Sequence, residues 1–314
     1  MPSTQEQTEE TDTLSRRGRK DVSQQENLFR NRLSTDEIYE RVLIEADEEI
    51  GRCNRELFFS GVAAGFAITI TVLIYASMTA AAGDTPLIGA LLYPIGFIYI
   101  ILGNYQLYTE NTLPPVALIL DRLAGVPAML RMWGVVLIGN LAGGTVGALL
   151  LAYGGVLDPT AATTLTGIAM TGIETPWFDL FFKAVFAGLI VAGVVWLDFG
   201  VRSATARFLL VYVAFLTIPL GGLFHVVVAS TEVMYLVFLG EIAFLNGVLN
   251  FALPVLLGNT IGGVVLVTTI NYYQTSHELH EISDKLSVSD WLFTTKTALD
   301  PETLQERLES KISH

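Results

Sequence analysis

The chain has 314 residues, 52% of them hydrophobic, and a mean hydropathy of +0.52, which is typical of a protein of the lipid bilayer. Its formal net charge of −13 argues against nucleic acid as a partner, and a single cysteine allows no disulfide within the chain. Residues 1–56 hold 14 of the 31 acidic residues and residues 275–314 hold eight, so the segment between them carries too few charges for a soluble core.

The N-terminal segment is polar. Residues 1–34 are predicted to form a disordered cytoplasmic tail. Ser34 and Glu37 have the spacing of a capping box, in which each side chain accepts a hydrogen bond from the other residue's backbone N–H. Residues 35–56 carry apolar side chains at helical spacing. We therefore expect a cytoplasmic amphipathic helix that lies against the protein or the membrane face.

Residues 57–274 consist of apolar segments and form the predicted transport domain. About 20 apolar residues cross a bilayer as a helix, and on that basis the segments correspond to six spans. The predicted spans cover roughly residues 57–81, 86–124, 131–154, 178–200, 205–246 and 249–274. The second and fifth are too long for one crossing and are interrupted by polar residues at 106–115 and near 221–232. Residues 275–314 are predicted to be a cytoplasmic tail with one short helix after Pro301.

Basic residues orient these spans, because cytoplasmic connections carry an excess of lysine and arginine. Nine basic residues precede residue 57, four follow residue 274, and Arg122, Arg131, Arg202 and Arg207 lie in connections on that same side. Lys183 is the one exception. We therefore expect a multi-pass protein of the cell membrane with both termini in the cytoplasm.

The chain contains an internal repeat. Gly139-Asn140-Leu141-Ala142-Gly143-Gly144 returns 119 residues later as Gly258-Asn259-Thr260-Ile261-Gly262-Gly263. The same offset subtracted from His225 gives Gln106, and both residues lie in polar interruptions. Each half contains three spans, so the second half inserts upside down. The expected fold is an all-α membrane protein of two inverted three-helix repeats, with the broken second and fifth helices meeting at similar depth.

A broken spanning helix is tolerated only where the break is buried in protein or lines a cavity. Two breaks in register with a repeat therefore predict a cavity between them, and the new helix N-termini attract anions. We expect the polar residues of the first break to lie along the solute pathway: Gln106, Thr109, Glu110 and Asn111.

His225 is the one histidine in an apolar segment. It is either a gate or proton donor in a pore, since histidine changes charge near neutral pH, or a neutral side chain that fixes the loop. Glu110 and Glu232 either face the pathway or cap backbone N–H groups of the loops. Lys183 either draws anions to the outer mouth or is a snorkelling surface residue.

Small residues four apart allow helices to approach closely. Gly139 and Gly143 have this spacing, as do Gly258 and Gly262, and all four are predicted to pack helices together. Asn140 and Asn259 beside them either bond to neighbouring backbone or line the pore.

Over roughly residues 55–275 the chain resembles the formate/nitrite transporter family. The motifs that carry the resemblance occur in the family's order: Gly-Val-Ala-Ala-Gly in the first span, Gln106-Leu107-Tyr108-Thr109, Gly139-Asn140-Leu141, Gly222-Leu223-Phe224-His225 and Leu253–Asn259. The resemblance implies an aquaporin-like fold, a homopentamer with one pore in each protomer, and a small monovalent anion such as formate, nitrite or hydrosulfide, or its weak acid, as the partner.

The resemblance also implies roles for single residues. His225 corresponds to the family's central pore histidine, Leu107 and Thr109 to residues of an omega-shaped first break, and Phe97 and Ile218 to constriction positions. The chain departs from the family at Phe224, where an acid is typical, at Ala229, where an asparagine is typical, and at Gly188, which matches a pore-side asparagine.

These departures keep a second function open, a pore for a neutral solute such as water, a small alcohol or an undissociated acid. An enzyme is disfavoured, because the sequence has no metal-ligand cluster, nucleophile motif or cofactor fingerprint. We expect no metal and no cofactor.

Overall fold

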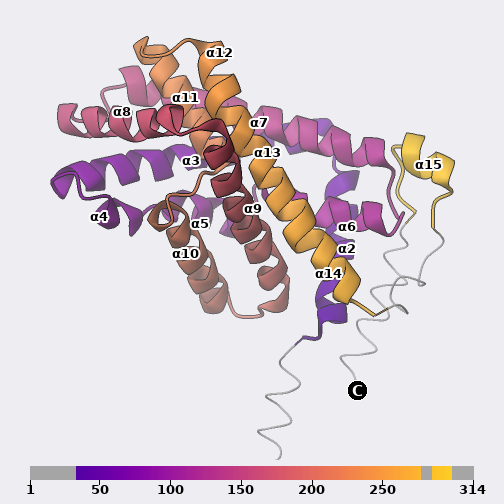
Figure 1. Cartoon of the computed structure of the whole chain (residues 1–314). Helices are drawn as coiled ribbons and strands as arrows, with labels where there is room; N and C mark the ends of the chain where they lie inside the picture. The colour runs from indigo at the N-terminus through magenta and orange to yellow at the C-terminus, as the bar shows by residue number, and fades with distance from the viewer. Residues whose placement is uncertain (1–32, 277–284, 299–314) are drawn as a thin grey trace, which may run out of the picture.

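Apolar helices build the part of the chain that the computed structural model describes, residues 33–276 and 285–298 (Figure 1). The α-helices are α2 (Thr35–Gly51), α3 (Asn54–Ala81), α4 (Pro86–Ala90), α5 (Ile95–Leu102), α6 (Pro114–Leu120), α7 (Val126–Tyr153), α8 (Pro159–Glu174), α9 (Trp177–Gly200), α10 (Ala204–Leu220), α11 (Val226–Leu239), α12 (Phe244–Gly247), α13 (Leu253–Ile261), α14 (Ile270–Gln274) and α15 (Val288–Phe293). A 3-10 turn, η1 (Glu110–Thr112), precedes α6, and two π-helical stretches, η2 (Val248–Ala252) and η3 (Gly262–Thr269), join α12, α13 and α14.

Four helices of the described residues are long and apolar enough to cross a membrane: Asn54–Ala81, Val126–Tyr153, Trp177–Gly200 and Phe244–Gln274. Shorter apolar helices, α5 with α6 and α10 with α11, occupy the two segments in which the sequence predicted broken spans. The all-helical class is confirmed.

The second break is shorter than predicted. The loop covers residues 221–225, and α11 resumes at Val226, so Ser230, Thr231 and Glu232 lie in a helix. The predicted connection 155–177 also contains a helix, α8, because Asp158 caps it by accepting from Thr160 N and Ala161 N at 2.9 Å. Polar threonines along α8 hide this helix from a search for apolar spans.

Helix α2 begins as its capping box predicts. Glu37 N donates to Ser34 Oγ at 3.2 Å, and Ser34 N donates to Glu37 Oε2 at 2.6 Å. Its apolar face is buried against α6, where the Tyr39 hydroxyl donates to Asp121 Oδ2 at 2.9 Å. Of the two placements expected for this helix, the structure shows the one against the protein.

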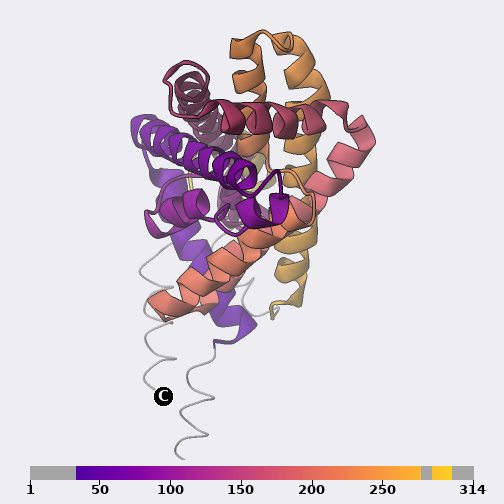
Figure 2. The ribbon, with the colours of Figure 1, turned by 90° about the vertical axis from the view of Figure 1, so that its left-hand side faces the viewer.

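The bundle has two distinguishable ends. Figure 1 shows α4 and α8 at one end, on the left, and α2, α14 and α15 at the other, and Figure 2 shows α10 crossing in front of α2. Helix α15 packs beside the end of α6, where Trp291 Nε1 donates to Ile119 O at 3.0 Å. Residues 1–32 and the helix expected after Pro301 lie outside the described residues.

Candidate functional site

Asn140 of α7 holds the first break. This fully buried side chain accepts from Tyr108 N at 2.9 Å through Oδ1 and donates through Nδ2 to Gln106 O and Gly61 O, both at 2.9 Å. It therefore grips the peptide groups on both sides of Leu107. Buried backbone groups need such partners, since each unsatisfied group costs about 1–3 kcal/mol.

Asn259 of α13 holds the second break in the same way. Its Oδ1 accepts from Val226 N at 2.8 Å, and its Nδ2 donates to Phe224 O at 3.0 Å and to Ala184 O at 2.9 Å. The residue between the gripped groups is His225. In this pattern the counterpart of His225 is Leu107, so the pairing of His225 with Gln106 from the 119-residue offset is wrong by one position.

Glycines allow both asparagine helices to approach their neighbours. A Cβ atom on Gly139 would lie 2.6 Å from Phe58 O, on Gly143 2.1 Å from Val62 O, on Gly258 2.3 Å from Phe181 O and on Gly262 2.0 Å from Val185 O. None of these four positions has room for a side chain.

Gly188 belongs to the same packing. A Cβ atom there would lie 2.1 Å from Asn259 O, as one on Gly65 would lie 2.0 Å from Asn140 O. Gly188, the position that matches a pore-side asparagine of the family, therefore faces the backbone of α13 in this chain.

The first break also contacts the second half of the chain. Thr268 Oγ1 donates to Thr112 O at 2.9 Å, and the Tyr108 hydroxyl lies 2.9 Å from Thr260 Oγ1. A Cβ atom on Gly263 would lie 1.9 Å from Thr112 Oγ1, and one on Gly144 would lie 2.6 Å from Thr231 Oγ1. In each half, a threonine side chain therefore occupies the space beside a glycine of the other half.

Two cavities lie on either side of the breaks. The first, which we call the α2-side cavity, has a volume of about 300 Å³. Its polar lining consists of Glu45, Glu49, Asn104, Glu110, Asn111, Asp198 and Arg207. The second, the α8-side cavity, has a volume of about 250 Å³ and is more apolar. Its lining includes Tyr75, Tyr93, Thr171, Phe224, His225 and Glu232.

His225, which lines the α8-side cavity, contacts Thr109 of the first break, and the next residue of that break, Glu110, lines the α2-side cavity. His225 is 1% exposed, and its Nε2 lies 2.8 Å from Thr109 Oγ1, while Nδ1 has no partner among the described residues. The Phe97 ring meets the imidazole edge to face, with centroids 5.0 Å apart. Leu107 and Ile218 are fully buried, and neither they nor Phe97 line either of these two cavities.

Gln106 ties helix α2 to the first break. Its Nε2 donates to Glu49 Oε1 at 2.7 Å, its Oε1 accepts from Asn111 Nδ2 at 2.9 Å, and its backbone N donates to Ser60 Oγ at 2.9 Å. Gln106 lines neither cavity, whereas Asn111 and Glu49 both line the α2-side cavity. Burial raises the pKa of Glu49 to about 7, although the hydrogen bond from Gln106 acts in the opposite direction.

This raised pKa predicts a pH dependence of stability. Between pH 4.5 and about 7 the folded protein holds a proton on Glu49 that the unfolded chain releases, so stability falls as the pH rises through this window. The loss is about 3 kcal/mol and is complete above the upper limit. We expect faster amide hydrogen exchange in α2 at pH 8 than the intrinsic exchange rates alone predict from data at pH 5.

The Glu49→Gln variant should remove most of this difference, because glutamine keeps an acceptor for Gln106 and does not ionise. Glu48→Gln is the matched control, since Glu48 is the preceding residue of the same helix and is exposed. Equal pH dependence in wild type and Glu49→Gln would show that Glu49 is not the responsible group.

The remaining charged candidates are Glu110, Glu232 and Lys183, and the structure does not show the two glutamates capping the loops. No hydrogen bond within the described residues joins the carboxyl of Glu110 or Glu232 to a backbone N–H, and Glu110 Oε1 is buried without a partner. Glu110 faces the α2-side cavity and Glu232 the α8-side cavity. Lys183 is exposed, lines neither cavity, and places Nζ 5.7 Å from the ring centroid of Phe224.

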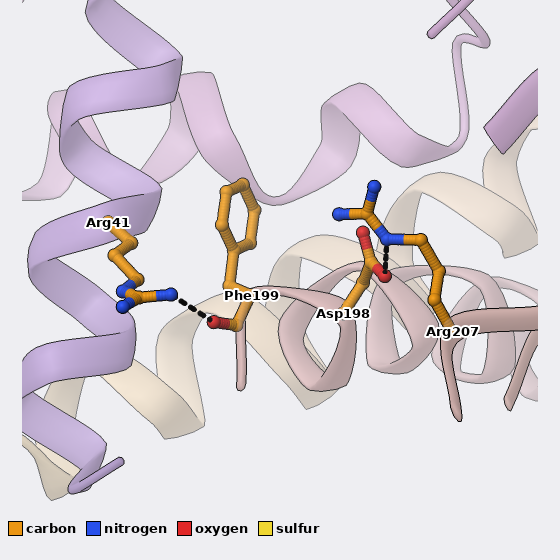
Figure 3. A network of polar contacts seen from close by, with 4 residues as sticks. All are labelled: Arg41, Asp198, Phe199 and Arg207. Carbon is orange, nitrogen blue, oxygen red and sulfur yellow. Dashed lines mark hydrogen bonds and ion pairs between the residues drawn. The ribbon is translucent and has the colours of Figure 1, made fainter. Parts of the chain in front are cut away.

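Figure 3 shows two arginines near the end of α9: Arg207 lines the α2-side cavity, and Arg41 lines an adjoining pocket that shares Glu45, Asp198 and Phe199 with it. Arg41 Nη1 of α2 donates to Phe199 O at 3.4 Å, and Arg207 Nε of α10 pairs with Asp198 Oδ1 at 2.5 Å. This acidic cavity was not predicted from the sequence. Its one available signal was Glu49, an acid on the face of α2 that also presents Ala46 and Ile50. Within residues 33–276 and 285–298, no three His, Cys, Asp or Glu side chains are grouped as metal ligands.

Comparison with known proteins shows which family this chain resembles in sequence. A family model described as formate/nitrite transporter matches residues 36–273. Inner membrane protein YfdC of Escherichia coli (strain K12) is 29% identical over 247 residues, covering 77% of this chain and 79% of that protein. Formate channel FocA of Haemophilus influenzae is 26% identical over 254 residues, covering 69% of this chain and 86% of that protein.

Solved structures share the fold. A pentameric formate channel with formate bound has a TM-score of 0.61 at 22% identity and covers 70% of this chain and 96% of its own. An ion channel of the same family has a TM-score of 0.66 at 20% identity and covers 76% of this chain and 99% of its own.

Proposed function

Because the chain belongs to the formate/nitrite transporter family, we propose that it conducts a small monovalent anion or its conjugate acid across the cell membrane. The pathway runs from the α2-side cavity past Thr109 and His225 to the α8-side cavity. The observation that carries this proposal is the 2.8 Å contact between Thr109 Oγ1 and His225 Nε2, which joins the two helix breaks between the cavity lined by Glu110 and the cavity lined by His225. Its relatives are transporters and channels, not enzymes.

The proposed architecture is six spans in two inverted three-helix repeats. Two features support it: the asparagine grip occurs once in each half, and the glycine–threonine contacts are exchanged between the halves. The α2 end is the proposed cytoplasmic side, because Arg41, Arg131 and Arg207 are found there.

A homopentamer with one pore in each protomer is the proposed assembly. The similar formate channel is pentameric, and the long helices of this chain carry large exposed apolar side chains that need lipid or protein neighbours. Phe178, Phe182 and Phe186 of α9, each more than half exposed, form one such stripe.

An ion that leaves water for an apolar constriction pays several kcal/mol, and a helix N-terminus returns only about 0.3–2 kcal/mol. In addition, a monovalent anion that passes about 6 Å from an ionised carboxylate of the protein is repelled by about 3 kcal/mol, at an effective dielectric constant of about 20. Hydrogen bonds from His225 and Thr109, the polar groups of the constriction, therefore contribute to passage.

The test is flux into proteoliposomes, by stopped flow, for formate, nitrite, hydrosulfide, acetate and glycerol. We expect His225→Phe to lower weak-acid flux by about tenfold or more, since one lost hydrogen bond to a charged group is worth about 1.5–3 kcal/mol. His225→Asn keeps a polar group and should retain more flux. Tyr235→Phe, on α11 but lining neither cavity, is the control.

The neutral-solute alternative predicts a different pattern. Phe224 and Glu232 in the wall of the α8-side cavity make this side unfavourable for a bare anion, which is the observation in its favour. Swelling with glycerol or water and no weak-acid flux in wild type would establish that alternative and refute the proposed one.

A further inference from the structure

The α2-side cavity is acidic, which is unexpected on the route of an anion. Four carboxyl groups line it, from Glu45, Glu49, Glu110 and Asp198, and the one cationic side chain in its lining, Arg207, is paired with Asp198. The last residues of α5 and α9, which also line the cavity, add the negative partial charge of helix C-termini. A bare anion is therefore repelled from this space.

Two of these carboxyl groups are buried with an oxygen that has no partner. Glu49 is 7% exposed, and its Oε2 accepts no hydrogen bond, while Oε1 binds Gln106 Nε2. Glu110 Oε1 is likewise buried without a partner. An ionised carboxylate in such a place costs several kcal/mol in proteins, whereas a carboxylic acid keeps an O–H that it can donate to a ligand.

We propose that Glu49 and Glu110 supply protons to a small weak-acid anion entering the α2-side cavity, so that the neutral acid passes the constriction. This inference rests on the proposed function and assigns its proton donors to two residues of the α2-side cavity. In the step, the O–H bond of a glutamic acid breaks and an O–H bond forms on the anion. The carboxylate that remains takes up a new proton from water at the mouth of the cavity.

The surroundings of the pair are defined by four elements. On α2 itself Glu45, Glu48 and Arg52 are the neighbouring charges, and the first break contributes the neutral amides of Gln106 and Asn111. Asp198 of α9 and Arg207 of α10 neutralise each other. Burial raises the pKa of Glu49 to about 7, so its carboxyl group is mostly protonated at pH values below about 7.

Proton donation by these glutamates also predicts which solutes pass most readily. Proton transfer is most effective when the donor and acceptor pKa values are close, so anions of weaker acids are favoured. Acetate and hydrosulfide should pass at least as readily as formate, and chloride, whose acid is strong, should not pass.

The experiment compares wild type with the double variant Glu49→Gln/Glu110→Gln in proteoliposomes, using formate and acetate across a pH series. In bulk water the neutral fraction of such acids falls about tenfold for each pH unit above their pKa. Flux through the double variant should decrease with pH in proportion to the neutral fraction of the acid, whereas wild-type flux should decrease less steeply with pH. We expect a difference of about tenfold or more at pH 7 and a difference within about twofold at pH 5.

Glu48→Gln is the control, because Glu48 is exposed on the same helix and does not line the cavity. The single variants are measured as well. A double variant that conducts more anion than wild type at pH 7, or that has the wild-type pH profile, would overturn the inference and leave the proposed function intact. No weak-acid flux in wild type would instead refute the proposed function.

Discussion

Replacement of Asn259 by leucine is expected to abolish weak-acid flux and to lower the yield of folded protein. Asparagine and leucine have similar shapes, so the variant tests the hydrogen bonds. Val226 N and Phe224 O would lose their side-chain partner, at a cost of about 1–3 kcal/mol each, whereas Ala184 O lies inside α9 and keeps its helical hydrogen bond. The sum is a large fraction of the stability of a typical domain, which is about 5–15 kcal/mol.

The measurement is size-exclusion chromatography in detergent, followed by proteoliposome flux for the fraction that remains folded. Asn250→Leu is the matched control, because Asn250 is exposed on the same long helix and its side chain donates to that of Asn246. If Asn259→Leu assembled and conducted like Asn250→Leu, the grip of Asn259 on the second break would be unimportant.

Gly188→Asn, which would introduce the residue typical of the family at this position, is expected to disrupt the packing of α9 on α13. Its Cβ atom would lie 2.1 Å from Asn259 O, a backbone atom that can move only if the helix moves. Overpacking of this kind costs about 1–3 kcal/mol or more. The displaced helix would also carry Asn259 away from the break, so flux and thermal stability should fall together.

Gly193→Ala provides the comparison for this prediction. Gly193 lies on the same helix, and a Cβ atom added there would meet no atom within 4 Å, so alanine should be tolerated and should raise helix stability by about 1 kcal/mol. A Gly188→Asn protein as stable as Gly193→Ala would mean that α9 and α13 can separate freely.

Much of the helix arrangement was predictable because long apolar segments have few alternatives in a bilayer. Helices α3, α7, α9 and α12–α14 lie where the predicted spans lie, and the repeated Gly-Asn motif marked the two helices that hold the breaks. Periodicity fails at the breaks themselves, since a loop residue is set by its hydrogen bonds. This is why the repeat offset selected Gln106, while the Asn140 grip encloses Leu107.

The acidic cavity was less predictable, because its groups come from segments distant in sequence. Glu49 lies on α2, Glu110 on η1 and Asp198 at the end of α9, and only the folded chain brings them to one space. A sequence pattern shows an acid on an apolar helix face, as for Glu49, but not the neighbour that it faces. For the same reason the sequence left open whether Glu110 caps the loop or faces the pathway, and the structure places it in the lining of the α2-side cavity.

The exchange of contacts between the halves has a consequence for how the protein is made. Thr112 O and the Tyr108 hydroxyl, both at the first break, find their partners in Thr268 and Thr260, about 150 residues later in the chain. A nascent chain that has inserted only its first three helices therefore carries an incomplete loop and an empty groove at Gly144. The segment that carries Thr260 and Thr268 must therefore be synthesised before the first break has all its hydrogen bonds.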